Sequence, residues 1–290
     1  WNTTFVREIA KVLDEIEKDE GPGALITSSE NPKFFSNGLD LDWMQDPKSN
    51  PDGGDRDVFG KEFMHLMGRF ITLPIPTICA INGHAFGAGF MLALTHDVRI
   101  MREDRGFLCA NEMQLGLSIP RPELSLFKHK IPANAFYETV QLSKRWTGTD
   151  ALDAGIVQAT SSFEELPELA VKKAEELAPL ATDRKNFGYQ KEMLFGENAA
   201  LRLTLSSTLF SSLFFSFFPI VTTEESLTLL SALRPPPRIG CCRRERSTIR
   251  KTNGCQCGAP HENLFVEVQA WWPHGDTLGV RRVRKRTLGT

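Results

Sequence analysis

TICAINGHAFGAGFMLAL, residues 77–94, passes from a strand to a helix through a glycine-rich turn. Residues 78–81 have the length and composition of a buried strand, and residues 90–94 are apolar enough for a buried helix. Gly87 and Gly89 lie at the junction, where the absence of a Cβ lets another group approach the backbone closely. The first N–H groups of a helix have no partner inside it, so this turn is a candidate oxyanion site. A tight junction packed against a neighbouring element is the alternative.

Composition divides the chain into two parts. The chain has 290 residues, 41% of them apolar, and can bury a sizeable core in one or two domains. Residues 1–202 carry 22 Lys and Arg against 30 Asp and Glu, whereas residues 203–290 carry 12 against 6. The second part is basic and shows no shared periodicity, so we expect a disordered or poorly packed tail, and we interpret it as a candidate gene-model artefact.

The tail contains two further features that could indicate a partner. Residues 203–221 carry no charge and reach membrane-spanning length, but their Ser residues and Pro219 weaken a membrane helix, so we expect none. The basic run 281–286 is better explained as a solvated surface than as a nucleic-acid site. We therefore expect neither a membrane nor a nucleic acid as partner.

The six cysteines follow the same division of the chain. Cys79 and Cys109 lie in apolar runs and are expected to be reduced core residues. The tail cysteines follow a C-C-x12-C-x-C spacing that matches common zinc sites poorly. They are Cys241, Cys242, Cys255 and Cys257. We therefore expect no metal site.

Strand-like runs alternate with helical periodicity in the first half of the chain, and helices predominate later. Strands are predicted at residues 24–27, 78–81, 98–101 and 107–110. Helices are predicted at residues 5–16, 58–71, 90–94, 123–130, 133–142, 149–154, 163–180 and 184–195. A polar stretch at residues 45–57 is expected to be a surface loop. This order favours an α/β fold with a helical C-terminal portion.

Glu112 is the candidate general base, because it follows the predicted strand 107–110 directly. We expect its carboxylate to be partly buried among the side chains of Phe107, Leu108, Met113 and Leu115. Such burial raises the pKa of a carboxyl group toward the range that a base near neutral pH needs. With main-chain amides around Gly38 and Leu39 and at residues 87–89, Glu112 would suit proton abstraction next to a carbonyl. A helix-capping or ion-paired surface glutamate is the alternative.

Four blocks of the sequence carry a family resemblance. They are KFFSNGLDL at residues 33–41, INGHAFGAGFMLALTHD at 81–97, NEMQLGLSIP at 111–120 and TGTDALDAGIV at 147–157. In this order and spacing they resemble the enoyl-CoA hydratase/isomerase (crotonase) superfamily. The resemblance covers residues 1–202, lacks the family's first strands and has no counterpart of the tail. The chain begins without Met inside a helical pattern, so we interpret its N-terminus as truncated.

The resemblance implies a crotonase-type ββα spiral with C-terminal helices, assembled as a homotrimer. It divides the chain into a ββα core at residues 1–160, a helical part at 161–202 and the tail at 203–290. It implies an acyl-CoA substrate without a separate cofactor, because coenzyme A is part of the substrate. The thioester oxygen would lie between the backbone N–H groups of Leu39 and Ala88. Further substrate-binding residues implied by the blocks are Lys33, near the CoA phosphates, Ser36, Asn37, Gly38, Asp40, Gly87, Gly89 and Met91.

The acid/base positions of the blocks point to a subfamily. Hydratases of this family use two glutamates, and here the first position is Met91 while the second is Glu112. This combination resembles Δ3,Δ2-enoyl-CoA isomerases, including plant and fungal peroxisomal types. It implies that Glu112 takes a proton from C2 of a 3-enoyl thioester and returns it to C4. Hydration or another acyl-CoA reaction on the same fold, and a non-catalytic acyl-CoA-binding protein, remain the alternatives.

The resemblance also bears on location. Peroxisomal relatives imply a peroxisomal protein, although the chain ends at Leu288-Gly289-Thr290 and lacks the targeting tripeptide. A cytoplasmic location is the alternative. The preference for acyl chain length is expected to depend on the loop at residues 45–57.

Overall fold

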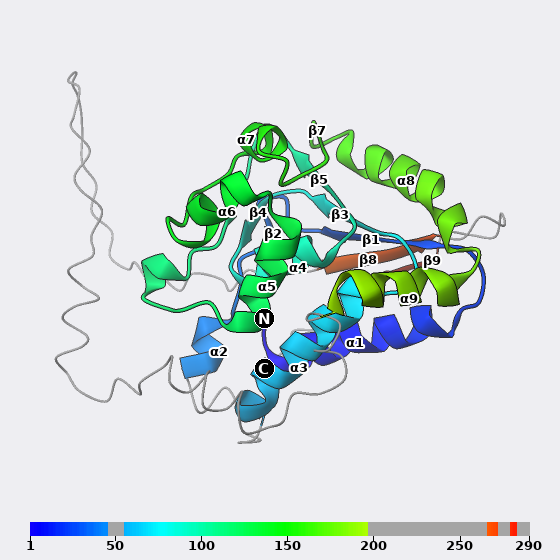
Figure 1. The fold of residues 1–290 in the computed structure, drawn as a ribbon, viewed down its shortest axis with the longest axis horizontal. Coiled ribbons are helices and arrows are strands. Elements are labelled where there is room, and N and C mark those ends of the chain that lie inside the picture. Colours follow the sequence, from blue (N-terminus) through cyan, green and yellow to red (C-terminus); the bar gives the residue numbers. More distant parts are fainter. Residues whose placement is uncertain (46–54, 197–265, 272–278, 283–290) are drawn as a thin grey trace, which may run out of the picture. The chain divides into compact units, whose positions relative to one another are not determined.

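The strand of the opening stretch is β3 (Thr77–Ile81), and it lies inside a larger sheet. The computed structural model describes residues 1–45, 55–196, 266–271 and 279–282. Within these ranges the larger sheet has the strand order β7-β5-β3-β1-β8-β9 (Figure 1). The parallel strands are β1 (Ala24–Ser29), β3, β5 (Val98–Arg102) and β7 (Ala159–Ser161). Residues 203–221 and the tail cysteines lie outside the described residues.

Three short strands form a second, smaller sheet. Its three parallel strands have the order β2-β4-β6. They are β2 (Phe34–Ser36), β4 (His84–Phe86) and β6 (Leu108–Cys109). Each of them follows one strand of the larger sheet in sequence, so each turn of the chain contributes one strand to each sheet. The glycine-rich segment between β3 and the following helix, which the sequence predicts to be a turn, contains the short strand β4, and His84 begins it.

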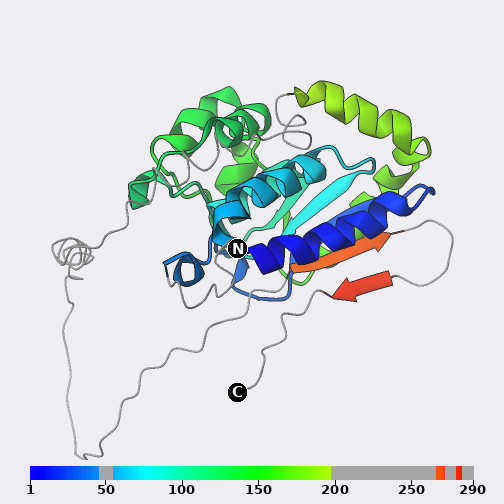
Figure 2. The ribbon, with the colours of Figure 1, turned by 90° about the horizontal axis from the view of Figure 1, so that it is seen from below.

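Helices cover the sheets and confirm the predicted α/β class with a helical C-terminal portion. They are α1 (Thr3–Lys18), α2 (Leu41–Gln45), α3 (Asp55–Ile71), α4 (Ala88–Thr95), α5 (Arg121–Lys130), α6 (Ala133–Val140), α7 (Gly148–Asp153), α8 (Leu166–Leu177) and α9 (Arg184–Leu194), with short 3-10 turns η2 (Met113–Leu115) and η3 (Ala178–Ala181). Helix α1 lies beside α3 (Figure 2). Every residue of α4 is buried, as its uncharged sequence predicts.

Two apolar clusters hold these layers together. The larger contains side chains from α1, α3 and α4, including Leu13, Phe63 and Phe90. The smaller lies between the larger sheet and α8, where Ala170 and Ala174 pack against Ile78 and its neighbours. The small side chains of α8 let this helix lie close to the sheet.

Part of the tail forms strands. β8 (Val266–Trp271) pairs antiparallel with β1, and β9 (Gly279–Arg282) pairs antiparallel with β8. The sequence VEVQAW at residues 266–271 alternates apolar and polar residues for its first five positions, which is a strand pattern that the composition of the tail obscured. The remaining residues of the predicted disordered tail lie outside the described ranges.

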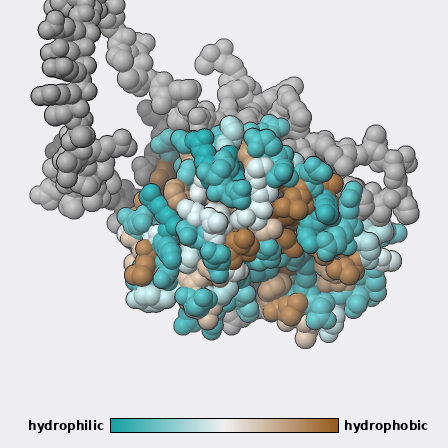
Figure 3. Space-filling model, turned by 90° about the horizontal axis from the view of Figure 1, so that it is seen from above, coloured by the Kyte–Doolittle hydropathy of each residue, from teal (hydrophilic) through white to brown (hydrophobic). Residues whose placement is uncertain are grey.

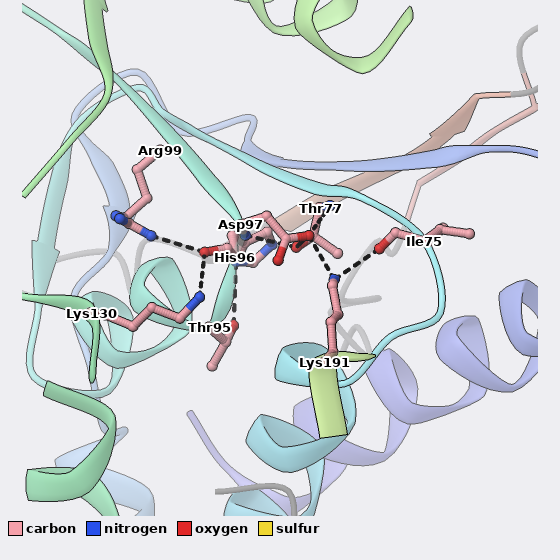
Figure 4. A network of polar contacts seen from close by, with 8 residues as sticks. All are labelled: Ile75, Thr77, Thr95, His96, Asp97, Arg99, Lys130 and Lys191. Atoms are coloured by element: carbon pink, nitrogen blue, oxygen red, sulfur yellow. Dashed lines mark hydrogen bonds and ion pairs between the residues drawn. The ribbon is translucent and has the colours of Figure 1, made fainter. Parts of the chain in front are cut away.

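A buried polar network joins α9 and α5 to the start of β5 (Figure 4). Asp97 accepts hydrogen bonds from Thr77 N at 2.8 Å and Thr77 Oγ1 at 3.0 Å, and its carboxylate pairs with Lys191 Nζ at 2.6 Å. Lys191 also donates to Ile75 O at 3.0 Å. Burial lowers the pKa of Lys191, and the charge of Asp97 opposes this shift. The ion pair therefore anchors the C-terminal helix α9 to the core.

The second half of the network centres on His96 (Figure 4). Its main-chain oxygen accepts hydrogen bonds from Arg99 Nη1 at 2.9 Å and Lys130 Nζ at 3.3 Å. Burial lowers the pKa of His96 to about 3, so the imidazole is neutral near physiological pH. Its Nε2 lies 2.8 Å from Thr27 Oγ1, which ties α4 to β1.

Candidate active site

The carboxyl ends of β2, β4 and β6 bring three of the predicted site segments to one edge of the smaller sheet. Leu39 follows β2, Ala88 follows β4, and Glu112 follows β6. Since these strands are parallel neighbours with β4 in the middle, their ends meet at the same edge. Ala88 therefore lies between the segments that contain Leu39 and Glu112.

Glycines allow the first two segments to approach each other. Gly38 has φ +88°, a left-handed conformation that favours glycine. A Cβ on Gly38 would lie 3.0 Å from Phe86 O and 3.7 Å from Ala88 N. The backbone before Leu39 therefore lies directly against the first residue of α4.

The N–H groups of Leu39 and Ala88 have no acceptor in the described part of the chain, although their neighbours do. On one side, Gly38 N donates to Ser36 Oγ at 3.5 Å and Asp40 N donates to Trp1 O at 3.0 Å. On the other side, Gly87 N donates to Cys109 O at 3.0 Å. Ala88 is also the first residue of α4, where the helix dipole is positive. Two such donors are suited to a developing oxyanion.

Glu112 faces the same turn. Its Oε1 lies 3.4 Å from the position that a Cβ on Gly87 would occupy. Its Oε2 is buried and has no hydrogen-bond partner among the described residues. Burial raises the pKa of Glu112, and a hydrogen bond from its own backbone opposes this shift. A desolvated, unpaired carboxylate of this kind can act as a general base.

The source of this burial differs from the sequence prediction. The side chains of Met113 and Leu115 are 44% and 53% exposed, because the 3-10 turn η2 directs them outward. They were expected to cover Glu112, and that expectation was wrong. Glu112 instead lies close to the main chain of the Gly87 turn.

The other residues predicted to bind substrate differ in their burial and in their hydrogen-bond partners. Ser36 is buried, and its Oγ accepts a hydrogen bond from Trp1 Nε1 at 3.0 Å. Asp40 uses Oδ1 to accept from Trp43 N at 3.0 Å, and so caps α2. Asn37 is exposed, and Met91 is buried within α4. The substrate-binding roles of these side chains stay predictions.

Lys33 lies apart from the converging segments. It precedes β2, at the end of this strand opposite to Leu39, and its side chain is exposed. Its Nζ lies 4.8 Å from the centre of the Phe34 ring. The predicted contact of Lys33 with CoA phosphates stays a prediction.

One buried carboxyl group was not predicted from the sequence. Glu123 lies in the first turn of α5 and is 5% exposed. It shares one helix face with Leu126, Phe127 and Lys130 at helical spacing, and this face could have been identified in the sequence.

The structure also bears on cysteine, metal and membrane predictions. Cys79 and Cys109 are buried free cysteines, as predicted. Among the described residues, no group of three or more His, Cys, Asp or Glu could hold a metal ion. In the same part of the chain, no helix is long and apolar enough to cross a membrane.

Gly89 gives a test of the close contact between β2 and α4. A Cβ at this position would lie 2.4 Å from Ser36 O, so we expect Gly89→Ala to lower stability by about 1–3 kcal/mol. Thermal unfolding measures this change. Gly196→Ala is the control, since a Cβ there meets no atom within 4 Å. Equal melting temperatures for the two variants would contradict the close contact.

Comparison with known proteins gives a family match. The sequence profile described as Enoyl-CoA hydratase/isomerase matches residues 1–216. The chain is 36% identical over 177 residues to the peroxisomal enoyl-CoA delta isomerase 2 of Arabidopsis thaliana, covering 60% of this chain and 74% of that protein. It is 34% identical over 200 residues to the peroxisomal enoyl-CoA delta isomerase 1 of the same plant, covering 68% and 81%.

Solved structures give a matching fold. The crystal structure of human mitochondrial delta3-delta2-enoyl-CoA isomerase aligns with a TM-score of 0.66 and 26% sequence identity. The alignment covers 80% of this chain and 86% of the human chain.

Proposed function

Because the chain belongs to the enoyl-CoA hydratase/isomerase family, we propose that it converts 3-enoyl-CoA to trans-2-enoyl-CoA. The observation that carries this proposal is the buried Glu112 carboxylate, whose Oε2 has no hydrogen-bond partner among the described residues and which faces the Gly87 turn. The N–H groups of Ala88 in this turn and of Leu39 beside it also have no acceptor among the described residues. The family assignment and the fold support an enzymatic role of the crotonase type for this chain, with an acyl-CoA as substrate. Two relatives named as enoyl-CoA delta isomerases support the narrower reaction.

The proposed reaction needs one base and no cofactor. The Glu112 carboxylate removes a proton from C2, and the electron pair of that C–H bond delocalises onto the thioester oxygen as a dienolate. The N–H groups of Leu39 and Ala88 bind this oxygen, and each such donor contributes about 3–4 kcal/mol of transition-state stabilisation. The protonated Glu112 then gives its proton to C4. The double bond moves from C3=C4 to C2=C3, and Glu112 is again a carboxylate.

Helix α4 supports isomerisation over hydration. Hydration requires a polar group that holds and activates water beside the acyl chain. Met91 and its neighbours in α4 are apolar and buried, so this helix supplies no such group.

An assay of two substrates tests the proposal. We expect the full chain to isomerise 3-hexenoyl-CoA faster than it hydrates 2-hexenoyl-CoA, because one carboxylate can serve both C2 and C4. Absorbance of the conjugated 2-enoyl thioester measures both reactions, appearing in the first and disappearing in the second. Faster hydration would favour a hydratase, and the absence of both reactions would favour a non-catalytic acyl-CoA-binding protein.

We propose a homotrimer located in the peroxisome, on the resemblance and the names of the plant relatives. Several large apolar side chains are exposed in the single chain, and Figure 3 shows hydrophobic patches between hydrophilic ones on one face. The exposed apolar side chains include Tyr137, Leu142, Leu180, Tyr189, Met193 and Leu194. Such side chains are consistent with burial against further copies. Light scattering of the purified chain tests the trimer.

A further inference from the structure

Residues 36–40, the donor segment, carry the Leu39 N–H and are held in place by Trp1. The main-chain nitrogen of Trp1 donates a hydrogen bond to Gly38 O at 2.8 Å, and Trp1 O accepts one from Asp40 N at 3.0 Å. These two bonds lie on either side of Leu39, whose own N–H has no acceptor among the described residues. Trp1 therefore pairs with both neighbours of the donor and leaves the donor itself available.

The bond to Gly38 O acts on the Leu39 donor through a shared peptide group. The oxygen of Gly38 and the N–H of Leu39 belong to one planar, trans peptide, so they point in opposite directions. Because Gly38 O points toward Trp1, the Leu39 N–H points away from Trp1. A hydrogen bond to the oxygen of an amide also polarises its N–H and strengthens it as a donor. Trp1 therefore acts on both the direction and the strength of this donor.

The side chain of Trp1 holds the donor segment at a further point. Its indole Nε1 donates to Ser36 Oγ at 3.0 Å, and Gly38 N donates to the same oxygen at 3.5 Å. Ser36 is buried against α4, since a Cβ on Gly89 would lie 2.4 Å from Ser36 O. The indole bond thus joins the end of β2 to the residue that precedes α1.

Aromatic packing fixes the indole in this position. Trp1 is 5% exposed, and its ring meets the rings of Phe5 and Phe63 edge-on, with ring centres 4.9 and 5.2 Å apart. Asn2, the next residue, donates from Nδ2 to Asp40 Oδ2 at 3.2 Å and accepts from Phe5 N to cap α1. Helices α1 and α3 therefore give Trp1 a rigid support from which it holds the donor segment.

We propose that Trp1 is a positioning residue for the oxyanion site and acts through the Leu39 N–H. Its main chain sets the plane of the peptide that contains this N–H, and its indole bond to Ser36 keeps the donor segment against α1. Ser36 acts in this arrangement as the acceptor that the indole needs. The inference rests on the proposed isomerisation, because it assigns Trp1 to a donor that binds the dienolate oxygen.

Two substitutions break the indole bond from opposite sides. Trp1→Phe keeps an aromatic ring against Phe5 and Phe63 but removes the indole N–H, and Ser36→Ala removes its acceptor. Loss of a whole oxyanion donor lowers kcat by about 10²–10³-fold. Here the main-chain bonds remain, so we expect kcat for 3-hexenoyl-CoA to fall about 10-fold in each variant. KM should change little, because the donor matters most when charge develops on the thioester oxygen.

The double variant tests whether both substitutions act through one bond. Trp1→Phe combined with Ser36→Ala should lower kcat no further than the more severe single variant, since either change alone breaks the bond. Effects that multiply would show that the two side chains act independently, and would overturn the inference.

Trp146 offers a matched control in another part of the chain. It is 4% exposed, and its indole Nε1 donates to Thr139 Oγ1 at 3.0 Å, the same length as the bond from Trp1 to Ser36. Trp146→Phe and Thr139→Val should lower the melting temperature, as Trp1→Phe does, but leave kcat unchanged. A wild-type kcat in Trp1→Phe, or an equal fall of kcat in Trp146→Phe, would overturn the inference.

The carbonyl stretch of a bound, unreactive thioester gives a readout besides activity. Hexanoyl-CoA has no double bond to move, and hydrogen bonds to its thioester oxygen lower the C=O stretching frequency. Infrared difference spectroscopy with an isotope-labelled carbonyl measures this downshift. We expect a downshift on binding to wild type and to Trp146→Phe, and a smaller one on binding to Trp1→Phe or Ser36→Ala.

The two readouts separate this inference from the proposed function. An active chain whose downshift is the same in wild type and Trp1→Phe overturns the role of Trp1 alone. A chain whose downshift depends on Trp1 but which converts neither hexenoyl-CoA overturns the proposed reaction and leaves the positioning role in place. A chain that binds no hexanoyl-CoA and converts neither substrate overturns both.

Discussion

Replacing Glu112 with Gln should lower kcat for 3-hexenoyl-CoA by about 10²–10⁴-fold, the usual contribution of a positioned general base. The amide has nearly the same shape but cannot accept the C2 proton. KM should change little, because the main-chain donors of Leu39 and Ala88 remain in place. Steady-state kinetics at a fixed pH measure both constants.

The control for this experiment is a glutamate outside the site. Glu138→Gln changes an exposed group that pairs with Lys144, so its kcat should equal that of wild type. If Glu112→Gln also retained the wild-type rate, Glu112 would not be the base. Circular dichroism of both variants shows whether each is folded as wild type is.

Replacing Asp97 with Ala should give the largest loss of stability. Lys191 would remain charged with a side chain only 6% exposed, and Ile75 O would be its one remaining hydrogen-bond acceptor among the described residues. Breaking a buried ion pair by removing one partner costs about 3–5 kcal/mol. For a chain of this size we expect a melting temperature lower by roughly 6–12 °C, which thermal unfolding measures.

A double mutant separates the charge from the packing. Lys191→Met removes the buried charge and keeps most of the side-chain volume, so Asp97→Ala combined with Lys191→Met should recover part of the lost stability. Glu62→Gln, which breaks the more exposed pair with Arg7, should cost under about 1 kcal/mol. If Asp97→Ala lowered the stability of the protein no more than Glu62→Gln does, the buried pair would not anchor α9.

Much of the fold could be predicted because its signals are local. The helix predicted at residues 5–16 is α1, which begins where the Asn2 side chain accepts a hydrogen bond from Phe5 N. The buried strand β3 is an apolar run after its first residue, and β1 begins with three apolar residues, so both have the composition of a buried strand. The comparisons support the α/β class and the family that the four sequence blocks indicated.

The missed features depend on contacts between distant residues. β4 has three residues and carries His84, so neither length nor periodicity marks it as a strand. The pairing of Asp97 with Lys191 joins residues 94 positions apart. The buried face of α5, which contains Glu123, packs against α4, and no local pattern specifies that partner.

The catalytic roles were inferred from the sequence, and the structure adds geometry. It places the unpaired N–H groups of Leu39 and Ala88 beside the segment that contains Glu112. It also shows that Met113 and Leu115 are exposed, which the apolar composition around Glu112 did not indicate.

Because two of the three groups in this site belong to the main chain, scanning mutagenesis of side chains would overlook them. Leu39→Ala keeps the nitrogen and its hydrogen, and residue 88 is already alanine. Only chemistry on the peptide link itself, such as replacing that amide with an ester, deletes either donor. Sequence drift at these two positions is therefore compatible with an unchanged reaction, provided that the neighbouring glycines keep the backbone in its present path.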